Sequence, residues 1–383
     1  MGTSFPRQLE MLRLASLTLF ALVAIGGAFA ARLSDTPVLP ETPYDYEGLE
    51  LPSHLNTNAT LRWDTTPADN PITNAGATLG RVLFYDVRLS RNETISCASC
   101  HRQEHGFSDP RPLSIGFEGG VTPRSSMALA IPRYDPSRKF FWDQRARTLE
   151  DLALEPIQDP IEMGMTLDEL TARLAATSFY PDLFADAFGT PEITSDRVAR
   201  ALAQFVRSIV ASNSKYDAAR EADGGYAGAP MAGLSDQENR GLQLFYGKGG
   251  CQNCHGGDLL MGGRATSNGL DSTVTDVGAG QGRFKIVTLR NIGLTAPYMH
   301  DGRFETLEEV IDHYSTGIQP GPGLDGRLSD GNGPIRMNFS DEEKAALVAF
   351  LHTLTDTTLA TNPMWSDPFA AVTTNDSVSG ARR

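Results

Sequence analysis

The 383-residue chain has only four cysteines, and no histidine occurs between His105 and His255. The cysteines form two C-x-x-C pairs, Cys97 with Cys100 and Cys251 with Cys254, so no thiol remains for a disulfide. A zinc site is disfavoured because the pairs of a zinc ribbon usually lie ~15–20 residues apart, much closer than these. A thioredoxin-like redox pair is disfavoured as well, because the strand–helix context of that motif is missing.

Basic residues and long apolar runs are also scarce. The formal net charge of −14 argues against a nucleic-acid partner and suits docking to a basic redox protein. The one long uncharged run, residues 14–31, follows Arg7 and Arg13 and ends in the small-x-small pattern Ala28-Phe29-Ala30. We predict that residues 1–31 are a signal peptide cleaved near Ala30, with an uncleaved membrane anchor as the alternative. Both alternatives place the rest of the chain in the periplasm, without another membrane span.

Each cysteine pair is followed directly by a histidine. The pattern C-x-x-C-H is typical of covalent attachment of a c-type haem. Two thiols at this spacing can reach the two vinyl groups of one porphyrin, and the next histidine then lies under the iron. We therefore predict two covalently bound haem c groups, with the four cysteines as attachment points and His101 and His255 as proximal iron ligands.

The helix signals divide the chain into two regions. Capping residues predict helix starts at Thr148, Thr166, Ser195, Ser235, Thr306 and Ser340, whereas no run of residues predicts a strand. The predicted order is an extended surface arm (32–72), an N-terminal haem domain (73–212), a glycine-rich linker (213–233), a C-terminal haem domain (234–360) and a tail (361–383). The expected fold class is mainly α, with two cytochrome-c-like domains in one chain and one covalent haem in each.

Axial ligands decide whether a haem transfers electrons or reacts with a small oxidant. For the first haem, His105 lies too close to His101 to reach the opposite face, and the possible sixth ligands are Met127, Met163 and Met165. Trp142 and Glu162 occur in the same region. From the residue types alone, Trp142 is a packed core aromatic and Glu162 a solvated loop carboxylate.

Between about residues 73 and 355 the chain resembles the bacterial di-haem cytochrome c peroxidase and MauG family. The resemblance is carried by LFYDVRLS before the first motif, by FWDQRA and PIEMG, by the second motif, and by the long segment TLRNIGLTAPYMHDGRFETLEEVIDHY. It implies two helical haem domains with a calcium ion between them. It also implies that the N-terminal haem reacts with hydrogen peroxide and that the C-terminal haem holds or relays electrons.

The resemblance assigns roles to individual residues. Glu162 matches the distal glutamate that transfers protons during cleavage of the peroxide O–O bond. Trp142 matches the tryptophan that relays electrons between the haems. Thr295 and Pro297 match positions that give backbone oxygens to calcium, a cation that prefers such ligands. Ser125 falls near the family's asparagine ligand, and this departure weakens the calcium prediction.

Two further departures distinguish the chain from the ordinary cytochrome c peroxidases. Phe117 stands where those enzymes have a loop histidine that closes the peroxidatic haem at rest, and phenylalanine cannot bind iron. Tyr314 stands where they have the axial methionine of the second haem, and MauG-like proteins have tyrosine there. Met337, Met299 and His313 are the competing ligands. Packing alone could also explain Tyr314, since Leu307, Val310, Ile311 and Tyr314 share one helix face.

These residues predict an enzyme, a periplasmic di-haem peroxidase of MauG-like type. It would reduce hydrogen peroxide at the N-terminal haem and draw electrons through the C-terminal haem from a protein partner, with a modified side chain of that partner as one source. One alternative is an ordinary cytochrome c peroxidase that removes peroxide with a small cytochrome or cupredoxin as donor. The other is a non-enzymatic di-haem electron carrier.

Overall fold

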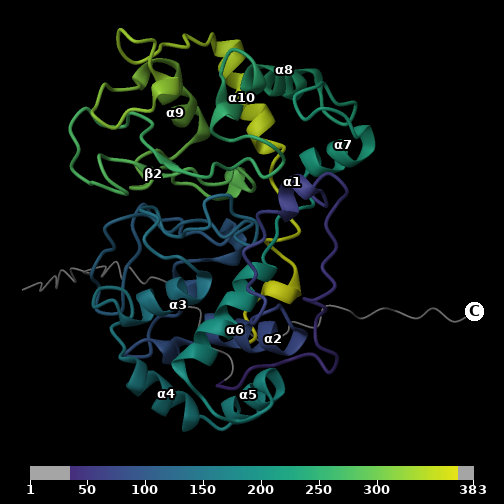
Figure 1. Cartoon of the computed structure of the whole chain (residues 1–383), viewed down its shortest axis with the longest axis vertical. Coiled ribbons are helices and arrows are strands. Elements are labelled where there is room, and N and C mark those ends of the chain that lie inside the picture. The colour runs from purple at the N-terminus through teal and green to yellow at the C-terminus, as the bar shows by residue number, and fades with distance from the viewer. Residues whose placement is uncertain (1–34, 370–383) are drawn as a thin grey trace, which may run out of the picture.

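The computed structural model describes residues 35–369, so the predicted signal peptide lies outside the described residues. The chain forms two lobes, one above the other in Figure 1, and it is mostly helical as predicted. The only strands within residues 35–369 are β1 (Ala265–Thr266) and β2 (Phe284–Lys285), which pair antiparallel. No helix of the described part is long and apolar enough to cross a membrane.

The N-terminal lobe is built on a pair of crossed helices. Helix α2 (Asn74–Tyr85) packs against α6 (Ser195–Ser208), and Gly80 makes the close approach possible. A Cβ atom added to Gly80 would lie 1.9 Å from the carbonyl oxygen of Ala201, a distance that no side chain can accommodate. Around this pair lie α3 (Leu149–Gln158), α4 (Leu167–Ala175) and α5 (Tyr180–Phe188).

The C-terminal lobe repeats this arrangement. Helix α8 (Asp236–Tyr246) packs against α10 (Asp341–His352), and α9 (Leu307–Asp312) lies beside α10. A Cβ atom added to Gly241 would lie 1.9 Å from the carbonyl oxygen of Ala346, the same clash as at Gly80. Both lobes therefore use a glycine to bring two helices into backbone contact, although the two halves share little local sequence.

Most predicted helix starts are confirmed. The side chains of Thr148, Thr166, Ser235, Thr306 and Ser340 each accept a hydrogen bond from the backbone N–H three residues later. The prediction for α6 was wrong by one residue, because Thr194 and not Ser195 is the N-cap. The remaining short elements are α1 (Asn58–Leu61), α7 (Lys215–Asp223), η1 (Val87–Leu89), η2 (Cys97–Ser99), η3 (Gln103–His105), η4 (Cys251–Asn253), η5 (Ile292–Leu294), η6 (His313–Gly317), η7 (Gly326–Leu328) and η8 (Pro363–Trp365).

Three segments outside the two predicted haem domains are more ordered and more buried than the sequence predicted. The predicted linker 213–233 contains α7, and Tyr216 of this helix is fully buried in the core of the C-terminal lobe. The predicted surface arm buries Tyr46, whose hydroxyl donates a 2.6 Å hydrogen bond to the carbonyl oxygen of Met364. The described part of the predicted tail therefore returns to the N-terminal lobe, where Trp365 is buried in the core. Long-range packing, which local composition does not encode, orders all three segments.

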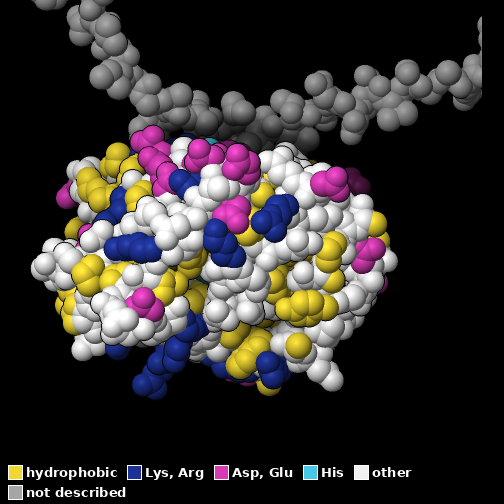
Figure 2. Space-filling model, turned by 90° about the horizontal axis from the view of Figure 1, so that it is seen from above, with side chains coloured by type: hydrophobic (Ala, Val, Ile, Leu, Met, Phe, Trp, Pro, Cys, Tyr) yellow, Lys and Arg dark blue, Asp and Glu magenta, His cyan; other side chains and the backbone are white. Residues whose placement is uncertain are grey.

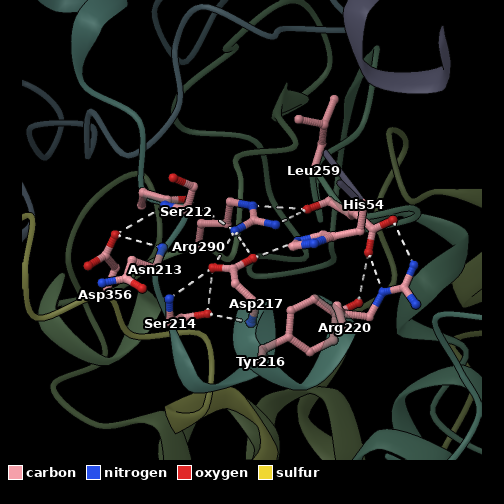
Figure 3. A network of polar contacts seen from close by, with 12 residues as sticks. His54, Ser212, Asn213, Ser214, Tyr216, Asp217, Arg220, Leu259, Arg290 and Asp356 are labelled. Atoms are coloured by element: carbon pink, nitrogen blue, oxygen red, sulfur yellow. Dashed lines mark hydrogen bonds and ion pairs between the residues drawn. The ribbon is translucent and has the colours of Figure 1, made fainter. Parts of the chain in front are cut away.

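A buried ionic network joins segments that lie far apart in the chain (Figure 3). Arg290 Nη1 lies 2.8 Å from a carboxylate oxygen of Asp217 and donates to the carbonyl oxygen of Ala211 at 3.0 Å. His54 Nε2, from the arm, lies 2.8 Å from the same Asp217 side chain. Asp356 accepts hydrogen bonds from the backbone N–H groups of Ser212 and Asn213. The network ties the arm and both lobes to the segment that connects the lobes.

The surface carries both signs of charge. Figure 2 shows the molecule from above, and on this face acidic side chains gather along one edge while Lys and Arg side chains are scattered over the rest. The excess of acidic residues in the sequence therefore does not form one uniform acidic field on this face.

Candidate functional site

One cavity of about 450 Å³ reaches both C-x-x-C-H motifs. Its wall includes all four cysteines together with His101 and His255, and residues of both lobes contribute to it. The four thiols are free of disulfides and partly exposed, so they are available for covalent attachment of a ligand.

The two motif histidines have the same hydrogen-bond geometry. Nδ1 of His101 lies 3.0 Å from the carbonyl oxygen of Phe107, and Nδ1 of His255 lies 3.2 Å from that of Leu260. A carbonyl oxygen can only accept, so each Nδ1 carries the proton and donates it. Nε2 of each ring then keeps its lone pair, which is the form that binds iron. Burial lowers the pKa of both histidines, to about 4 for His255, and this keeps the rings neutral.

The two accepting carbonyls come from residues in the left-handed backbone region. Phe107 has a φ of 58° and Leu260 a φ of 51°, and each follows its motif within a few residues. Sequence reasoning missed both residues. The nearby glycines, Gly106 and Gly257, were the available signal for a tight turn, but they do not reveal which carbonyl faces the histidine.

Glu162 lies in the turn that follows α3 and lines the cavity. It shares this cavity with Cys97 and Cys100 of the first motif, and its carboxylate raises the pKa of both thiols. Burial raises the pKa of Glu162 to about 7, and the neighbouring carboxylate of Asp159 acts in the same direction, while Arg145 lowers it. A carboxyl group with such a pKa can both take and return a proton near neutral pH.

Phe117 is turned away from the cavity. It is buried, and the described residues that line the cavity include Gly116 but not Phe117. The ring packs against Gly164, where an added Cβ would lie 2.4 Å from Phe117 Cζ, and the backbone N–H of Phe117 donates to the carbonyl oxygen of Glu162 at 3.0 Å. The loop that would close the first site with a histidine instead supports the glutamate.

The methionines near the first motif differ in their access to the cavity. Met127 and Met163 line it, whereas Met165 is buried and is not part of the described wall. The backbone of Met127 lies close enough to the His101 ring to raise its pKa, which places Met127 on the histidine side. Met163, beside Glu162, is therefore the methionine that must be tested as a ligand on the opposite side.

Trp142 lies on the cavity wall where the two lobes meet. Its indole Nε1 donates a 2.9 Å hydrogen bond to the carbonyl oxygen of Ser125, and its own carbonyl oxygen accepts from the backbone N–H of Lys285 at 2.8 Å. The ammonium group of Lys285 is buried in an ion pair with Asp135. The indole ring is in edge contact with His300, at 6.5 Å between ring centroids. Trp142 is thus fixed by residues of both lobes.

Tyr314 lies on the cavity wall near the second motif. Leu307, Val310 and Ile311 line the cavity with it, so the helix face predicted from the sequence points into the cavity. At Tyr314 the α-helical pattern of α9 has given way to the π-turn η6 (His313–Gly317), a distortion often found at functional sites. The Tyr314 hydroxyl lies 3.4 Å from Nδ2 of Asn268. Burial raises the pKa of Tyr314 to about 12, while the hydrogen bond from Asn268 lowers it.

The competing ligands for the second site are placed differently. Nε2 of His313 lies 3.0 Å from the carbonyl oxygen of Asn268, and His313 is not among the described residues of the cavity wall. Met299 and Met337 both line the cavity, and the Met299 sulfur lies 3.4 Å from Asn268 Nδ2. Tyr314, Met299 and Met337 thus all line the cavity that an iron ligand must enter, whereas His313 does not.

Comparison with known proteins decides the family. The family model described as di-haem cytochrome c peroxidase matches residues 74–224. MauG, the methylamine utilization protein of Methylorubrum extorquens, is 34% identical over 307 residues, which cover 75% of this chain and 80% of that protein. Cytochrome c551 peroxidase of Nitrosomonas europaea is 30% identical over 354 residues, which cover 89% and 90%.

The chain belongs to the di-haem cytochrome c peroxidase and MauG family. It is therefore a peroxidase-type oxidoreductase of a family that carries two haem c groups. A crystal structure of a MauG-like protein associated with microbial copper homeostasis is 35% identical, with a TM-score of 0.70, and covers 82% of this chain and 99% of that chain. The di-haem peroxidase BthA of Burkholderia thailandensis, at 23% identity and a TM-score of 0.65, supports the fold alone.

The residues of this family member fit two haem groups. The free thiols, the neutral motif histidines and the largely apolar helix face of Leu307 and Ile311 are the features that such a group requires. Within the described chain, no three His, Cys, Asp or Glu side chains form another metal cluster.

The residues predicted to bind calcium lie on the wall of the same cavity. Thr295 and Pro297 line the cavity, and the hydroxyl of Ser125 donates a 2.8 Å hydrogen bond to the carbonyl oxygen of Met299. Calcium takes 6–8 oxygen ligands, and the Ser125 hydroxyl keeps its lone pairs when it donates this hydrogen bond. We assign no functional step to calcium, and the ion remains a prediction from the resemblance.

Asn268 is the residue of the second site that sequence reasoning missed. It contacts Tyr314, Met299 and His313, yet it lies in a loop far before them in the chain. An isolated asparagine in a glycine-containing loop gives no local signal for such a contact.

Proposed function

We propose that this protein is a periplasmic di-haem peroxidase of MauG-like type, with hydrogen peroxide as electron acceptor at the N-terminal site. Electrons reach that site through the C-terminal haem from a protein partner, and a side chain of the partner is the proposed source. The haem groups, when bound, supply the iron that exchanges electrons with peroxide. The residues of the chain orient the reactants and move the protons.

The observation that carries this proposal is the position of Tyr314. Tyr314 lines the cavity near the second motif, and its phenol oxygen accepts a hydrogen bond from one side-chain donor, Asn268. An oxygen ligand favours oxidised iron more than a thioether does, because a hard anionic donor stabilises the higher charge. Such a site suits a haem that stores oxidising equivalents for use on another protein.

Glu162 and Trp142 have separate proposed roles. Glu162 accepts a proton from peroxide and returns it to the leaving oxygen, which its pKa of about 7 permits at neutral pH. Trp142, held by Ser125 and Lys285 at the meeting of the lobes, is the proposed electron relay between the two sites.

The ordinary cytochrome c peroxidase is the second candidate, and the methionine Met337 on the cavity wall favours it. In that enzyme a small cytochrome or cupredoxin is the donor, and the second haem is methionine-ligated. We do not propose the non-enzymatic electron carrier, because the chain belongs to a family of peroxidases. The likeness to the MauG-like protein of copper homeostasis, at 35% identity, supports the MauG-like alternative.

The ferric electron paramagnetic resonance spectrum of the purified protein tests the proposal. We expect one high-spin haem, the N-terminal one, and one low-spin haem without a methionine charge-transfer band in the optical spectrum. A methionine band, lost in Met337→Leu and retained in Tyr314→Phe, would establish the ordinary peroxidase instead. Elemental analysis of the same sample reports calcium, and mass spectrometry of the mature N-terminus reports cleavage near Ala30.

A further inference from the structure

A row of aromatic side chains runs from the second site to the surface of the C-terminal lobe. Phe245, near the end of α8, lines the cavity together with the second motif. Its ring lies 5.6 Å from that of Tyr246, centroid to centroid. Tyr246 in turn is in edge contact with Tyr226, at 5.7 Å between ring centroids. Three rings in succession therefore connect the cavity with Tyr226.

Tyr226 is exposed but held in place. Its relative exposure is 69%, the largest among the exposed large hydrophobic residues that the structure describes. Gly228 lets the chain pass close to both rings, because a Cβ added there would lie 2.7 Å from Tyr246 Cγ and 2.8 Å from Tyr226 Cε1. The carbonyl oxygen of Tyr226 accepts a 2.9 Å hydrogen bond from the N–H of Ala229. This turn keeps the solvent-facing ring of Tyr226 against the partly buried ring of Tyr246.

Tyr246 carries a hydroxyl group that packing does not require. The hydroxyl oxygen is buried and has no hydrogen-bond partner within the described chain. A buried hydroxyl without a partner costs about 1–3 kcal/mol, which phenylalanine at the same place would avoid. Tyrosine differs from phenylalanine chemically in that it can be oxidised by one electron. The Tyr216 hydroxyl lies close enough to the Tyr246 hydroxyl to lower its pKa, and it donates a 3.2 Å hydrogen bond to Asp258. It is therefore the group that can receive the Tyr246 proton when Tyr246 is oxidised.

We propose that Tyr246 and Tyr226 form a one-electron relay that connects the second haem with an electron donor bound at the surface beside Tyr226, in the loop between α7 and α8. The inference deepens the proposed function, on which it rests, by placing the point where an external electron enters. Phe245 is the ring through which Tyr246 is coupled to the cavity, since phenylalanine is not itself oxidised.

The relay balances in electrons and protons. When a haem is bound at the second site, Tyr246 would return to it one of the two electrons that peroxide has taken. The Tyr246 phenolic proton would pass to the Tyr216 hydroxyl as Tyr216 passes its own proton to Asp258. Tyr246 is restored by an electron from Tyr226 as its proton returns, and Tyr226 releases its own proton to water. A one-electron donor at the surface then reduces the Tyr226 phenoxyl, which takes a proton from water.

Flash-quench spectroscopy tests the relay without peroxide. The holoprotein, with its haems reduced, is mixed with tris(bipyridine)ruthenium(II) and a cobalt(III) pentaammine quencher, and a laser flash generates the ruthenium(III) oxidant. Oxidation of the ferrous haem is followed by transient absorption. We expect a fast phase in the wild type and loss of that phase in both Tyr226→Phe and Tyr246→Phe. Tyr44→Phe is the control, because Tyr44 is a partly buried tyrosine that packs against the core of the N-terminal lobe.

The outcomes separate the relay from the proposed function. Three results would overturn the relay. The wild type could lack the fast phase, both tyrosine variants could retain it, or Tyr44→Phe could remove it as well. Tyr246→Phe keeps the ring and removes only an unpartnered hydroxyl, so misfolding does not explain a loss there. Peroxide consumption is measured separately, and its absence in a protein that shows the fast phase would overturn the peroxidase proposal and leave the relay standing.

Discussion

The Tyr314 hydroxyl accepts its one described side-chain hydrogen bond from Asn268, at 3.4 Å. A donor aimed at the phenol oxygen stabilises the phenolate over the phenol, and it opposes the effect of burial on the pKa of Tyr314. A bound ferric ion would add a much larger effect in the same direction, because metals hold coordinated groups in the deprotonated form. The local structure thus prepares Tyr314 to act as an anionic oxygen ligand.

Tyr314→Met is expected to raise the reduction potential of the second haem. A thioether stabilises ferrous iron more than a phenolate does, so the potential moves toward that of an electron-transfer cytochrome. Tyr314→Phe is expected to leave an open or water-ligated iron, with the ring packing retained. Spectroelectrochemical titration measures both effects.

Tyr298→Phe is the matched control for Tyr314. Tyr298 also lines the cavity, but its hydroxyl donates a 3.0 Å hydrogen bond to the carbonyl oxygen of Ile292. Its loss should cost about 1 kcal/mol of stability and leave the second-haem spectrum unchanged. An unchanged spectrum and potential in Tyr314→Phe would show that Tyr314 is a packing residue, and Met337 would then be the ligand to test.

Glu162→Gln is expected to leave both haems attached and to slow the peroxide reaction by ~10²–10⁴-fold, the usual contribution of a general acid–base group. The amide keeps the size of the side chain but cannot accept the proton. Glu118→Gln is the control, because Glu118 is an exposed carboxylate of the nearby loop. Stopped-flow absorbance measures the rate constants, and equal rates in wild type and Glu162→Gln would remove the catalytic role.

The pH dependence of the same reaction follows from the pKa of Glu162, which is about 7. Only the deprotonated carboxylate can take a proton from peroxide, so the rate constant should rise as the pH increases through about 7 and then level off. The Gln variant should lack this inflection. A carboxyl group with this pKa titrates between about pH 5 and 9. A wild-type rate constant that does not change over this range would contradict the general-base role of Glu162.

Asp217→Asn is expected to lower the free energy of unfolding by about 3–5 kcal/mol, because it leaves the buried Arg290 guanidinium without its counter-ion. Arg290 and His54 hold the pKa of Asp217 well below the ordinary carboxyl value. The network therefore stabilises the protein above a pH of about 3.9 and loses this contribution as the pH falls further. Asp196→Asn removes an exposed ion pair with Arg200 and should change the stability only marginally. Equal denaturation midpoints for both variants would contradict this account.

Local signals predicted the parts of the structure that local chemistry determines. The haem motifs follow from the reach of two thiols, and the starts of α4, α8, α9 and α10 follow from a side-chain oxygen placed three residues before a glutamate. The helix face that lines the cavity and ends at Tyr314 was predicted from the helical periodicity of its apolar residues. These features depend on residues close together in the chain.

Features that depend on contacts between residues far apart in the chain could not be predicted from the sequence. The segment 213–233 looked like a linker because it is rich in glycine, yet Tyr216 and the Asp217–Arg290 ion pair fix it to the C-terminal lobe. Trp365 returns to the N-terminal core through contacts that only the fold brings together. The contact between Asn268 and Tyr314 and the turning away of Phe117 likewise depend on loop paths that no nearby residues specify.

Rapid mixing of the fully ferric protein with hydrogen peroxide tests the central claim most directly. Phe117 is turned away from the cavity, and Glu162 faces it, so the N-terminal site should accept peroxide without prior reduction. The account predicts an immediate change in the haem absorbance of the ferric protein, retained in Met163→Leu. A protein that reacts only after one haem has been reduced would contradict it.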